Sequence, residues 1–341
     1  MKRKALKWAE HGGQARCIAV VLARMLRPVL WLLGLLATIG GTIWAPFALA
    51  GEGLARTSGL LATGGPAIEV ITGYVTAPGA TYTAWTMATG NSNQIRSADS
   101  ASKAILLSAW GWNQTAGVLR IRSPRLHDAQ SAIRLRNPAN LCAPRFATYG
   151  FEAPQQLLIP QDVLTIEQTG SSTGGQIETG SLLIYYPALP GVAGRFIDGP
   201  TLQKQGINIL GQEVAITTGT AGGYSGQVAI NSTVDTLKAN TDYALMGIET
   251  DVRVCTIRVQ GVDSGNLGVG VPGEYTIPDV QANWFVRLSD SFGYPMIPVF
   301  NSANKTAILV DAVAQQSAVS VVATLIMIEL PAGAVPAAKI S

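Results

Sequence analysis

The sequence predicts an all-β protein in which two tandem antiparallel β-sandwiches follow a hydrophobic N-terminal helix. Beyond residue 65, short apolar or alternating runs are separated by turns rich in Gly, Pro, Asn and Ser, a spacing typical of antiparallel sandwiches. Landmarks in the first half of this region recur in the second half. Apart from the N-terminus, no long segment shows the 3.6-residue period of an amphipathic helix.

The composition indicates surfaces that are buried in an assembly or in a membrane. Of the 341 residues, 48% are hydrophobic and 13% are charged, whereas soluble domains usually carry about 25% charge. The same balance excludes a disordered chain, which needs low hydrophobicity and high charge. Residues 1–28 hold seven Lys and Arg against one Glu, so the basic charge is concentrated where an anionic membrane or nucleic acid could attract it.

Residues 1–65 are predicted to form a basic and hydrophobic arm that contacts a membrane. Residues 28–51 carry no charge, and a helix of this length, at about 1.5 Å per residue, is long enough to span a bilayer. Basic flanks and interfacial aromatic residues are the candidate membrane contacts. They are Lys2, Arg3, Lys4, Lys7, Arg24, Arg27, Trp31 and Trp44.

Three alternatives remain open for this arm. Ala48-Leu49-Ala50 resembles a small-residue cleavage site, which would make the segment a secretory signal peptide. Translation that begins later, for instance at Met25, would remove much of the arm. A core helix would have the same apolar composition.

Eleven runs in the remaining chain are expected to be strands, because they are short, apolar or alternating, and bounded by turn residues. In order they are AIEVITGYV (67–75), KAILLSAW (103–110), GVLRIRS (117–123), DVLTIEQTG (162–170), SLLIYYP (181–187), GQVAINS (226–232), YALMGIE (243–249), CTIRVQG (255–261), NWFVRLS (283–289), TAILVDAV (306–313) and VVATLIMIEL (321–330).

A weak internal repeat divides these strands into two domains, residues 66–190 and 191–341. KAILLSAWGWNQTAGVLRIRS (103–123) resembles DYALMGIETDVRVCTIRVQG (242–261), with Arg120 and Arg258 at an offset of 138. The runs that close the two halves match at an offset of 144. The Pro/Gly-rich segment 187–195 is the expected linker. Apolar runs shared by any two β-domains are the alternative explanation.

The glycine-rich stretch VCTIRVQGVDSGNLGVGVPG (254–273) invites comparison with a phosphate-binding loop. Such a loop needs a helix after its glycines, and here Pro272-Gly273 follows instead. We therefore expect a strand, a turn at residues 263–266 and a short return strand whose glycines permit close packing.

No motif points to catalysis, so we expect that the protein is not an enzyme. A GxSxG elbow does not occur, and a histidine-dependent mechanism would depend on His127, for which a surface or capping role is the simpler interpretation. The cysteine spacing excludes a structural zinc site. No cofactor is expected, and structural calcium has no ligand motif among the scattered turn carboxylates.

A cluster of arginines is the candidate site for an anion or a neighbouring subunit. Its members are Arg120, Arg122, Arg125, Arg134, Arg136 and Arg145. In VLRIR and AIRLR the arginines alternate with apolar residues, so they line one face of paired strands. Arg134 and Arg136 match Gly268 and Gly270 of the second half. A solvated face with ordinary ion pairs is the alternative interpretation.

The second half resembles the C-terminal jelly roll of double jelly-roll major capsid proteins. The resemblance is carried by YALMGIE, TIRVQGVDSGNLGVGVPG and NWFVRLSDSFGYPMIPVFNSANKTAILVDAV. The first half, with LRIRSPRLHDAQSAIRLRN and PQQLLIPQDVLTIEQTGS, is similar to the N-terminal jelly roll. The most similar members come from tailless icosahedral bacteriophages with an internal membrane, of the corticovirus and tectivirus kinds, and the likeness covers residues 66–331.

This resemblance implies two tandem eight-stranded jelly rolls in a structural virion protein. Three chains would form a pseudo-hexagonal homotrimer, and these capsomers would tile an icosahedral shell beside other capsid proteins such as a penton. The shell would enclose a membrane, without sequence-specific contact to nucleic acid. The long hydrophobic leader departs from the family pattern.

A secreted or membrane-anchored β-sandwich binding protein, such as an adhesin or a carbohydrate-binding module, is the alternative function. Exposed aromatic residues would be its signature, and Trp110, Trp112 and Trp284 are the candidates. A hydrolase on the same scaffold would need a carboxylate pair that no motif reveals.

Overall fold

The computed structural model describes residues 64–96, 103–126, 131–144, 156–192, 194–274, 276, 278–331 and 333–335. The chain divides into a unit of residues 1–61 and a unit of residues 62–341, and the description below concerns the second unit. The predicted N-terminal helix and all eight candidate membrane contacts lie outside the described residues, as do His127 and Arg145. Among the described residues, no helix has the length and apolar composition needed to cross a membrane.

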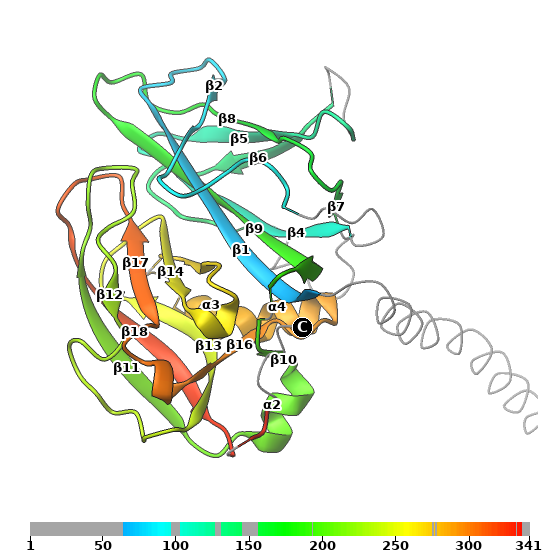
Figure 1. Cartoon of the computed structure of the whole chain (residues 1–341). Helices are drawn as coiled ribbons and strands as arrows, with labels where there is room; N and C mark the ends of the chain where they lie inside the picture. Colours follow the sequence, from blue (N-terminus) through cyan, green and yellow to red (C-terminus); the bar gives the residue numbers. More distant parts are fainter. Residues whose placement is uncertain are drawn as a thin grey trace, which may run out of the picture. The chain divides into compact units, whose positions relative to one another are not determined.

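The first half of the described chain forms two antiparallel sheets (Figure 1). Their strand orders are β3-β1-β9-β4-β7 and β2-β8-β5-β6. The strands are β1 (Gly64–Thr76), β2 (Thr83–Ala84), β3 (Thr86–Met87), β4 (Ala104–Trp112), β5 (Gly117–Arg122), β6 (Ile133–Asn137), β7 (Gln156–Leu158), β8 (Thr165–Gln168) and β9 (Ile177–Pro190).

The second half forms two further antiparallel sheets, with the orders β10-β16-β13-β18-β11 and β12-β17-β14-β15. The strands are β10 (Phe196–Ile197), β11 (Ile209–Thr217), β12 (Val228–Ala229), β13 (Asp242–Thr250), β14 (Thr256–Gln260), β15 (Val269–Pro272), β16 (Ile297–Asn301), β17 (Leu309–Val313) and β18 (Ser320–Glu329). The helices are α2 (Gly199–Gln205), α3 (Pro278–Ala282) and α4 (Trp284–Phe292), with the short 3₁₀ turns η3 (Val262–Ser264) and η4 (Ser302–Asn304).

The two halves have the same strand order when the short edge strands β3 and β10 are set aside. The order β1-β9-β4-β7 corresponds to β11-β18-β13-β16, and β2-β8-β5-β6 corresponds to β12-β17-β14-β15. The landmarks of the predicted repeat lie on corresponding strands, since 103–123 covers β4 and β5 and 242–261 covers β13 and β14. The prediction of an all-β chain built from antiparallel sheets is therefore confirmed.

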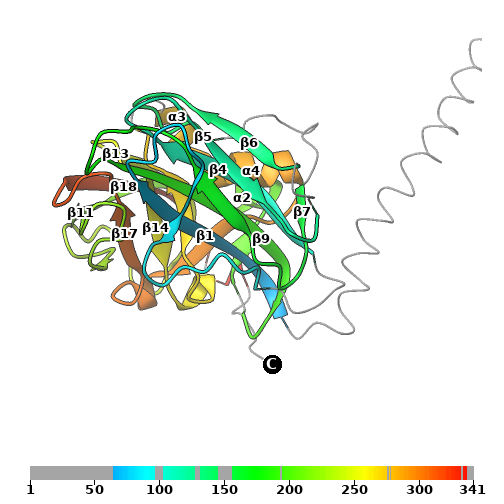
Figure 2. The ribbon, with the colours of Figure 1, turned by 90° about the horizontal axis from the view of Figure 1, so that it is seen from above.

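The sheet that contains β1, β9 and β4 is buried on both faces. Leu182 and Ile184 belong to a core shared with β5 and β8, whereas Leu183 and Tyr185 belong to a core shared with the second half. This explains why β9 reads as a continuous apolar run, because both of its alternating faces exclude water. Figure 2 shows β1 and β9 side by side along this layer. The four sheets thus stack as four layers (Figure 1).

The expected linker is partly strand, because β9 continues through Pro190 and pairs there with Gly64. The glycine-rich stretch does form a strand, a turn and a return strand. Its turn contains Gly265 and Asn266 in the left-handed region, with φ values of 69° and 58°. β14 and β15 pair as antiparallel neighbours on either side of this turn.

The run NWFVRLS was expected to be a strand, and this prediction is wrong. It begins helix α4, whose residues Trp284, Phe285, Leu288 and Phe292 are buried. Their spacing of one, four and eight residues places them on one helical face. Gly293, with φ 71°, ends the helix in the left-handed conformation. An apolar run this short fits either period, so it did not distinguish the helix from a strand.

Candidate functional site

Four of the six predicted arginines gather on the outer face of the sheet β2-β8-β5-β6. Arg120 and Arg122 lie on β5 and Arg134 and Arg136 on β6, and Arg120 pairs directly opposite Arg134. Intervening residues such as Leu119 point into the buried core. We call this surface the arginine face. Period-two alternation placed these side chains correctly, because one face of the sheet is buried and the other is not.

The other two predicted arginines are not part of the arginine face as described. Arg125 lies in the turn after β5, where its Nη1 donates to the carbonyl of Pro160 at 3.0 Å. Arg145 lies outside the described residues.

On the arginine face, Arg120 is held by a carboxylate and an aromatic ring. Its Nε lies 2.6 Å from Glu167, and its guanidinium lies 3.8 Å above the ring centre of Tyr82. The hydrogen bond that Arg120 donates to Glu167 raises the pKa of Arg120. We call Arg120, Glu167 and Tyr82 the first cluster. Arg122 also approaches Glu167, at 3.5 Å, so one carboxylate serves two arginines.

The face carries more positive than negative charge. Glu167 is the one carboxylate on the four strands of this sheet, all of which are described, whereas β5 and β6 contribute four guanidinium groups. Arg134 and Arg136 are exposed. A face whose strands contribute four guanidinium groups is suited to an anionic or acidic partner.

The same constellation occurs in the second half. Arg258 on β14 donates from Nε and Nη2 to both carboxylate oxygens of Asp311, at 2.7 and 2.8 Å, and lies 3.5 Å above the ring centre of Tyr224. We call these three residues the second cluster. The two clusters occupy corresponding positions in the strand pairing of the two halves, because Arg120 stands opposite Glu167 just as Arg258 stands opposite Asp311.

The second cluster is covered by the first half of the chain. A chain of hydroxyl groups crosses this internal contact: Tyr224 donates to Thr72 at 2.8 Å, Thr72 contacts Ser181 at 2.8 Å, and Ser181 contacts Thr256 at 2.6 Å. Trp110 of β4 donates to the carbonyl of Cys255 at 2.8 Å. Burial raises the pKa of Asp311, although its contacts with Arg258 act in the opposite direction.

Glycine makes this close approach possible. The backbone N–H of Val70 on β1 donates to the carbonyl of Gly268 at 2.9 Å. A Cβ atom on Gly270 would lie 2.6 Å from the Cβ of Val70, closer than side chains pack. Gly270 stands opposite Arg258 on the neighbouring strand, in the place that Arg134 takes opposite Arg120.

This register corrects the match drawn from the sequence. Arg134 corresponds to Gly270, and Arg136 corresponds to Pro272, which stands opposite Thr256. The pairing of Arg134 with Gly268 was therefore displaced by two residues, because the turns before β6 and β15 differ in length.

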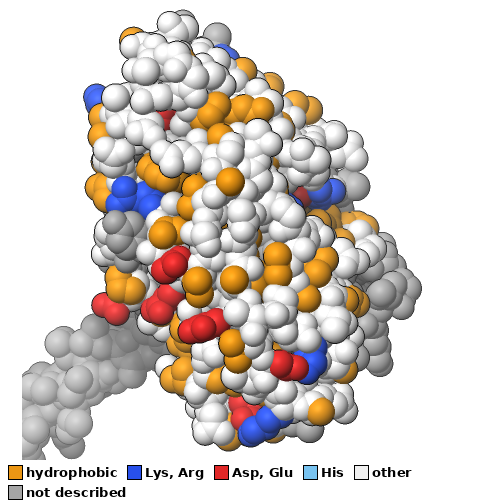
Figure 3. Space-filling model, turned by 90° about the vertical axis from the view of Figure 1, so that its left-hand side faces the viewer, with side chains coloured by type: hydrophobic (Ala, Val, Ile, Leu, Met, Phe, Trp, Pro, Cys, Tyr) orange, Lys and Arg blue, Asp and Glu red, His pale blue; other side chains and the backbone are white. Residues whose placement is uncertain are grey.

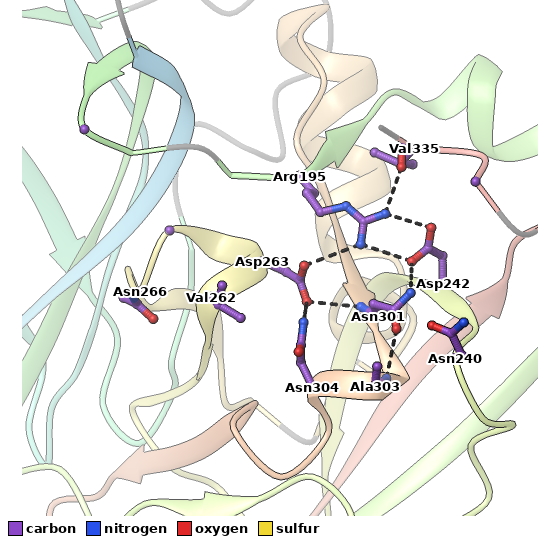
Figure 4. Close-up of a pocket in the computed structure, with 13 residues that line it drawn as sticks. Arg195, Asn240, Asp242, Val262, Asp263, Asn266, Asn301, Ala303, Asn304 and Val335 are labelled. Atoms are coloured by element: carbon purple, nitrogen blue, oxygen red, sulfur yellow. Dashed lines mark hydrogen bonds and ion pairs between the residues drawn. The ribbon is translucent and has the colours of Figure 1, made fainter. Parts of the chain in front are cut away.

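A cavity of about 560 Å³ lies at one end of the second half and is centred on Arg195 (Figure 4). Arg195 donates to both oxygens of Asp242, at 3.0 and 2.7 Å, to Asp263 at 3.4 Å and to the carbonyl of Val335 at 2.9 Å. Burial disfavours its charge, but the two carboxylates outweigh that effect and raise its pKa.

The Arg195 network joins segments that are distant in the sequence. It connects the segment after β9 with the start of β13, the turn η3 and the stretch near Val335 (Figure 4). Asp263 also accepts from the backbone N–H of Asn301 at 3.1 Å and from Asn304 at 3.2 Å. Both carboxylates are thus engaged in holding the fold. Among the described residues, no group of three or more His, Cys, Asp or Glu side chains gathers as metal ligands would.

Sequence reasoning did not identify Arg195. The only signal was a charged residue at the end of the Pro/Gly-rich segment 187–195, whose partners lie 47 and 68 positions further along the chain. A buried arginine needs a carboxylate partner, but nothing in the sequence shows which of the many turn carboxylates supplies it.

The tryptophans proposed as an exposed binding surface lie mostly in the core. Trp110 and Trp284 are 0% and 1% exposed, and their rings meet edge to face with centroids 5.8 Å apart. Trp112 is half-buried. The three side chains therefore do not form an exposed aromatic platform.

No family model matches the sequence, and no curated protein matches it. Solved structures give low similarity. The exported protein XepA of PBSX is 8% identical with a TM-score of 0.21, over 77% of this chain and 87% of that chain. A chain from Sulfolobus Turreted Icosahedral Virus is 10% identical with a TM-score of 0.18, over 78% and 83%.

The major capsid protein P2 from bacteriophage PM2 is 5% identical with a TM-score of 0.17, over 79% of this chain and 99% of that chain. Similarities this low carry no information about function.

Proposed function

We propose that the protein is a structural subunit that assembles with copies of itself, and specifically a major capsid protein that forms pseudo-hexagonal homotrimers in an icosahedral virion shell. The observation that carries the proposal is the repeated strand order of the two halves. With the eight main strands of each half numbered in sequence, the sheets run 1-8-3-6 and 2-7-4-5. This is the arrangement of a jelly roll, and so we assign two eight-stranded jelly rolls to the chain.

The contact between the two halves supports the same proposal. A face of the second half packs on the first half through apolar side chains and matched hydroxyl groups, including Thr256 and Ser181. Two domains of one architecture that bind each other through such faces provide surfaces for further copies to use. The clusters of charge described above are held in ion pairs, which suits a structural role better than catalysis.

The remaining expectations extend this proposal. The arm of residues 1–65 would contact an internal virion membrane through its basic flank and its two tryptophans. Other capsid proteins, such as a penton, would meet the trimers at the vertices of the shell. We assign no cofactor and no sequence-specific contact to nucleic acid.

Sedimentation velocity of the full chain, purified in a mild detergent, tests the proposal. We expect a species of three times the monomer mass at low and at physiological salt. A product that stays strictly monomeric across salt and calcium concentrations would contradict it. N-terminal sequencing of the expressed protein adds a second test, because cleavage after Ala50 would favour an exported binding protein instead.

A further inference from the structure

We infer that the arginine face of one copy docks on an acidic row at the opposite end of a second copy. The row consists of Glu213, Glu249 and Asp251, on the outer face of the sheet β10-β16-β13-β18-β11. The inference rests on the proposed self-assembly and names the surfaces that carry it. The partner is a second copy of this chain.

The register of three strands places the acidic side chains in a row. Glu213 on β11 and Glu249 on β13 both pair with Thr324 on β18, from its two sides. Asp251 follows two residues after Glu249, and its carboxylate accepts from the backbone N–H of Val322 at 2.8 Å. The row therefore crosses the sheet from β11 to the end of β13.

The row points outward. Val214 and Ile248, the neighbours of Glu213 and Glu249, and Leu325, the neighbour of Thr324, are fully buried. Alternate residues of a strand face opposite sides. Glu213 and Asp251 are exposed and Glu249 is half-buried. Figure 3 shows a face of the molecule on which most Asp and Glu side chains lie below the middle, with apolar side chains between them.

The outer faces of the first and the last layer thus differ in charge. The five strands of the sheet with the acidic row, all of them described, contain no Lys or Arg. The arginine face has four guanidinium groups and one carboxylate. Opposite potentials on two surfaces favour their encounter and fix their orientation.

The fold already contains one contact of this kind. Inside the chain, the sheet β12-β17-β14-β15 lays its face on the sheet that contains β1, β9 and β4, as the contacts of Tyr224 and Gly268 show. By strand order, the sheet with the arginine face corresponds to the sheet β12-β17-β14-β15. The sheet with the acidic row corresponds to the sheet that contains β1, β9 and β4. The inferred contact between copies therefore pairs the same two kinds of sheet as the internal contact. Inside the chain the first half supplies the sheet with β1, β9 and β4, whereas between copies the first half supplies the arginine face and the second half supplies the acidic row.

The internal contact between the two halves brings the sheets closer together than the inferred contact between copies can. Gly270 allows backbone atoms to meet in the internal contact, whereas Arg134 occupies that place on the arginine face. Copies must therefore be held apart by charged side chains, and their contact is more sensitive to salt than the internal one. A head-to-tail contact of this type closes into a ring or continues as a filament, and three copies close the ring in the proposed function.

Charge reversal tests the inference. We expect the double variant Arg134→Glu/Arg136→Glu to dissociate at a protein concentration roughly tenfold above that of the wild type, measured by sedimentation velocity at low salt. The variant Glu213→Arg/Glu249→Arg should do the same. All four substitutions in one chain should restore assembly, because the charges again complement each other. Arg125→Glu is the matched control, since Arg125 lies off the face, and it should assemble like the wild type.

The outcomes separate the two proposals. A monomeric wild type contradicts the proposed function itself. A wild-type trimer that persists unchanged in both double variants contradicts the docking inference and leaves the proposed function standing. Loss of binding to vesicles of anionic lipid by Arg134→Glu/Arg136→Glu, with its trimer intact, would assign the face to a membrane and overturn the inference. Failure of the fourfold variant to recover, with its fold intact by circular dichroism, would also overturn it.

Discussion

The first and second clusters combine the same three groups, an arginine, a carboxylate and a tyrosine ring, in opposite surroundings. In the first cluster the arginine and carboxylate side chains are 19% and 12% exposed, and in the second they are 11% and 1% exposed. The first cluster lies on the outermost layer, and the second lies beneath a neighbouring sheet. Because both sheets carry such a cluster, the cluster itself does not determine whether another sheet packs on that face.

The residue opposite the arginine makes the difference. Gly270 has no side chain, so the strand β1 can approach within contact of the backbone. Arg134, in the corresponding place, holds any neighbouring sheet away and adds a charge. One position thus distinguishes the sheet that packs closely against the first half from the outermost sheet of the same strand order. Four predictions follow from this comparison, beginning with the largest effect.

Gly270→Arg makes the second half like the first at this position. The new side chain has no room beneath Val70, so we expect the free energy of unfolding to fall by about 4 kcal/mol or more. Denaturant unfolding followed by tryptophan fluorescence measures the loss. Gly226→Ala is the control, because a Cβ there meets nothing within 4 Å, and it should change stability by less than about 0.5 kcal/mol. Equal effects of the two substitutions would contradict the account.

Arg258→Ala and Arg120→Ala remove the same group from the two clusters. Loss of Arg258 leaves the carboxylate of Asp311 buried without its partner, which costs about 3 kcal/mol. Loss of Arg120 leaves Glu167 with Arg122 and some access to water, so the cost should be about 1 kcal/mol or less. Unfolding curves of the two variants check the ratio. A larger loss for Arg120→Ala would show that the burial of the two clusters has been assigned the wrong way round.

Tyr224→Phe and Tyr82→Phe compare the tyrosines of the two clusters. Both substitutions keep the ring beneath the arginine, but Tyr224→Phe removes the hydrogen bond to Thr72 across the internal contact. We expect a loss of about 1 kcal/mol for Tyr224→Phe and almost none for Tyr82→Phe. Thermal melts of the two variants provide the measurement, and indistinguishable melting temperatures would argue against the hydroxyl chain.

The smallest effect is a difference in titration between buried and exposed carboxylates. Burial raises the pKa of Asp311 above its ordinary 3.8, whereas the hydrogen bond from Lys305 lowers the pKa of Asp235. As pH falls, Asp311 is protonated first, and between its folded pKa and 3.8 this favours the folded state. Asp235 contributes stability above pH 3.8 that is lost as pH falls through its lower folded pKa. Carboxyl carbon shifts measured by NMR should show the two midpoints on opposite sides of 3.8, and the reverse order would refute the assignment.

Much of the fold follows from local patterns. A strand buried on both faces appears as a continuous apolar run, as in β9, and a strand buried on one face alternates, as in β5. Each pattern reflects which sides of the strand exclude water. Helix α4 did not follow, because seven residues fit both periods. Its burial of Trp284 and Leu288 depends on a partner sheet that the sequence does not reveal.

The site was predictable only in part. Alternation showed that Arg120 and Arg134 share an outer face, since the period of a strand is local information. The partners were not predictable, because Glu167 and Tyr82 come from other strands and the loop lengths that set their register are free to vary. For the same reason the repeat identified the glycines of the second half but misplaced the one that matters, Gly270, by two residues.

The central claim is that the arginine face of one copy meets the acidic row of another, and a cross-link between them tests it most directly. In a Cys17→Ser background, the pair Arg134→Cys and Glu249→Cys should be joined by a short bis-maleimide, while Cys142 and Cys255 are fully buried. We expect covalent dimers and trimers on a denaturing gel, and monomers alone from either single variant. A double variant that assembles as a trimer but gives only monomers after cross-linking would contradict the claim.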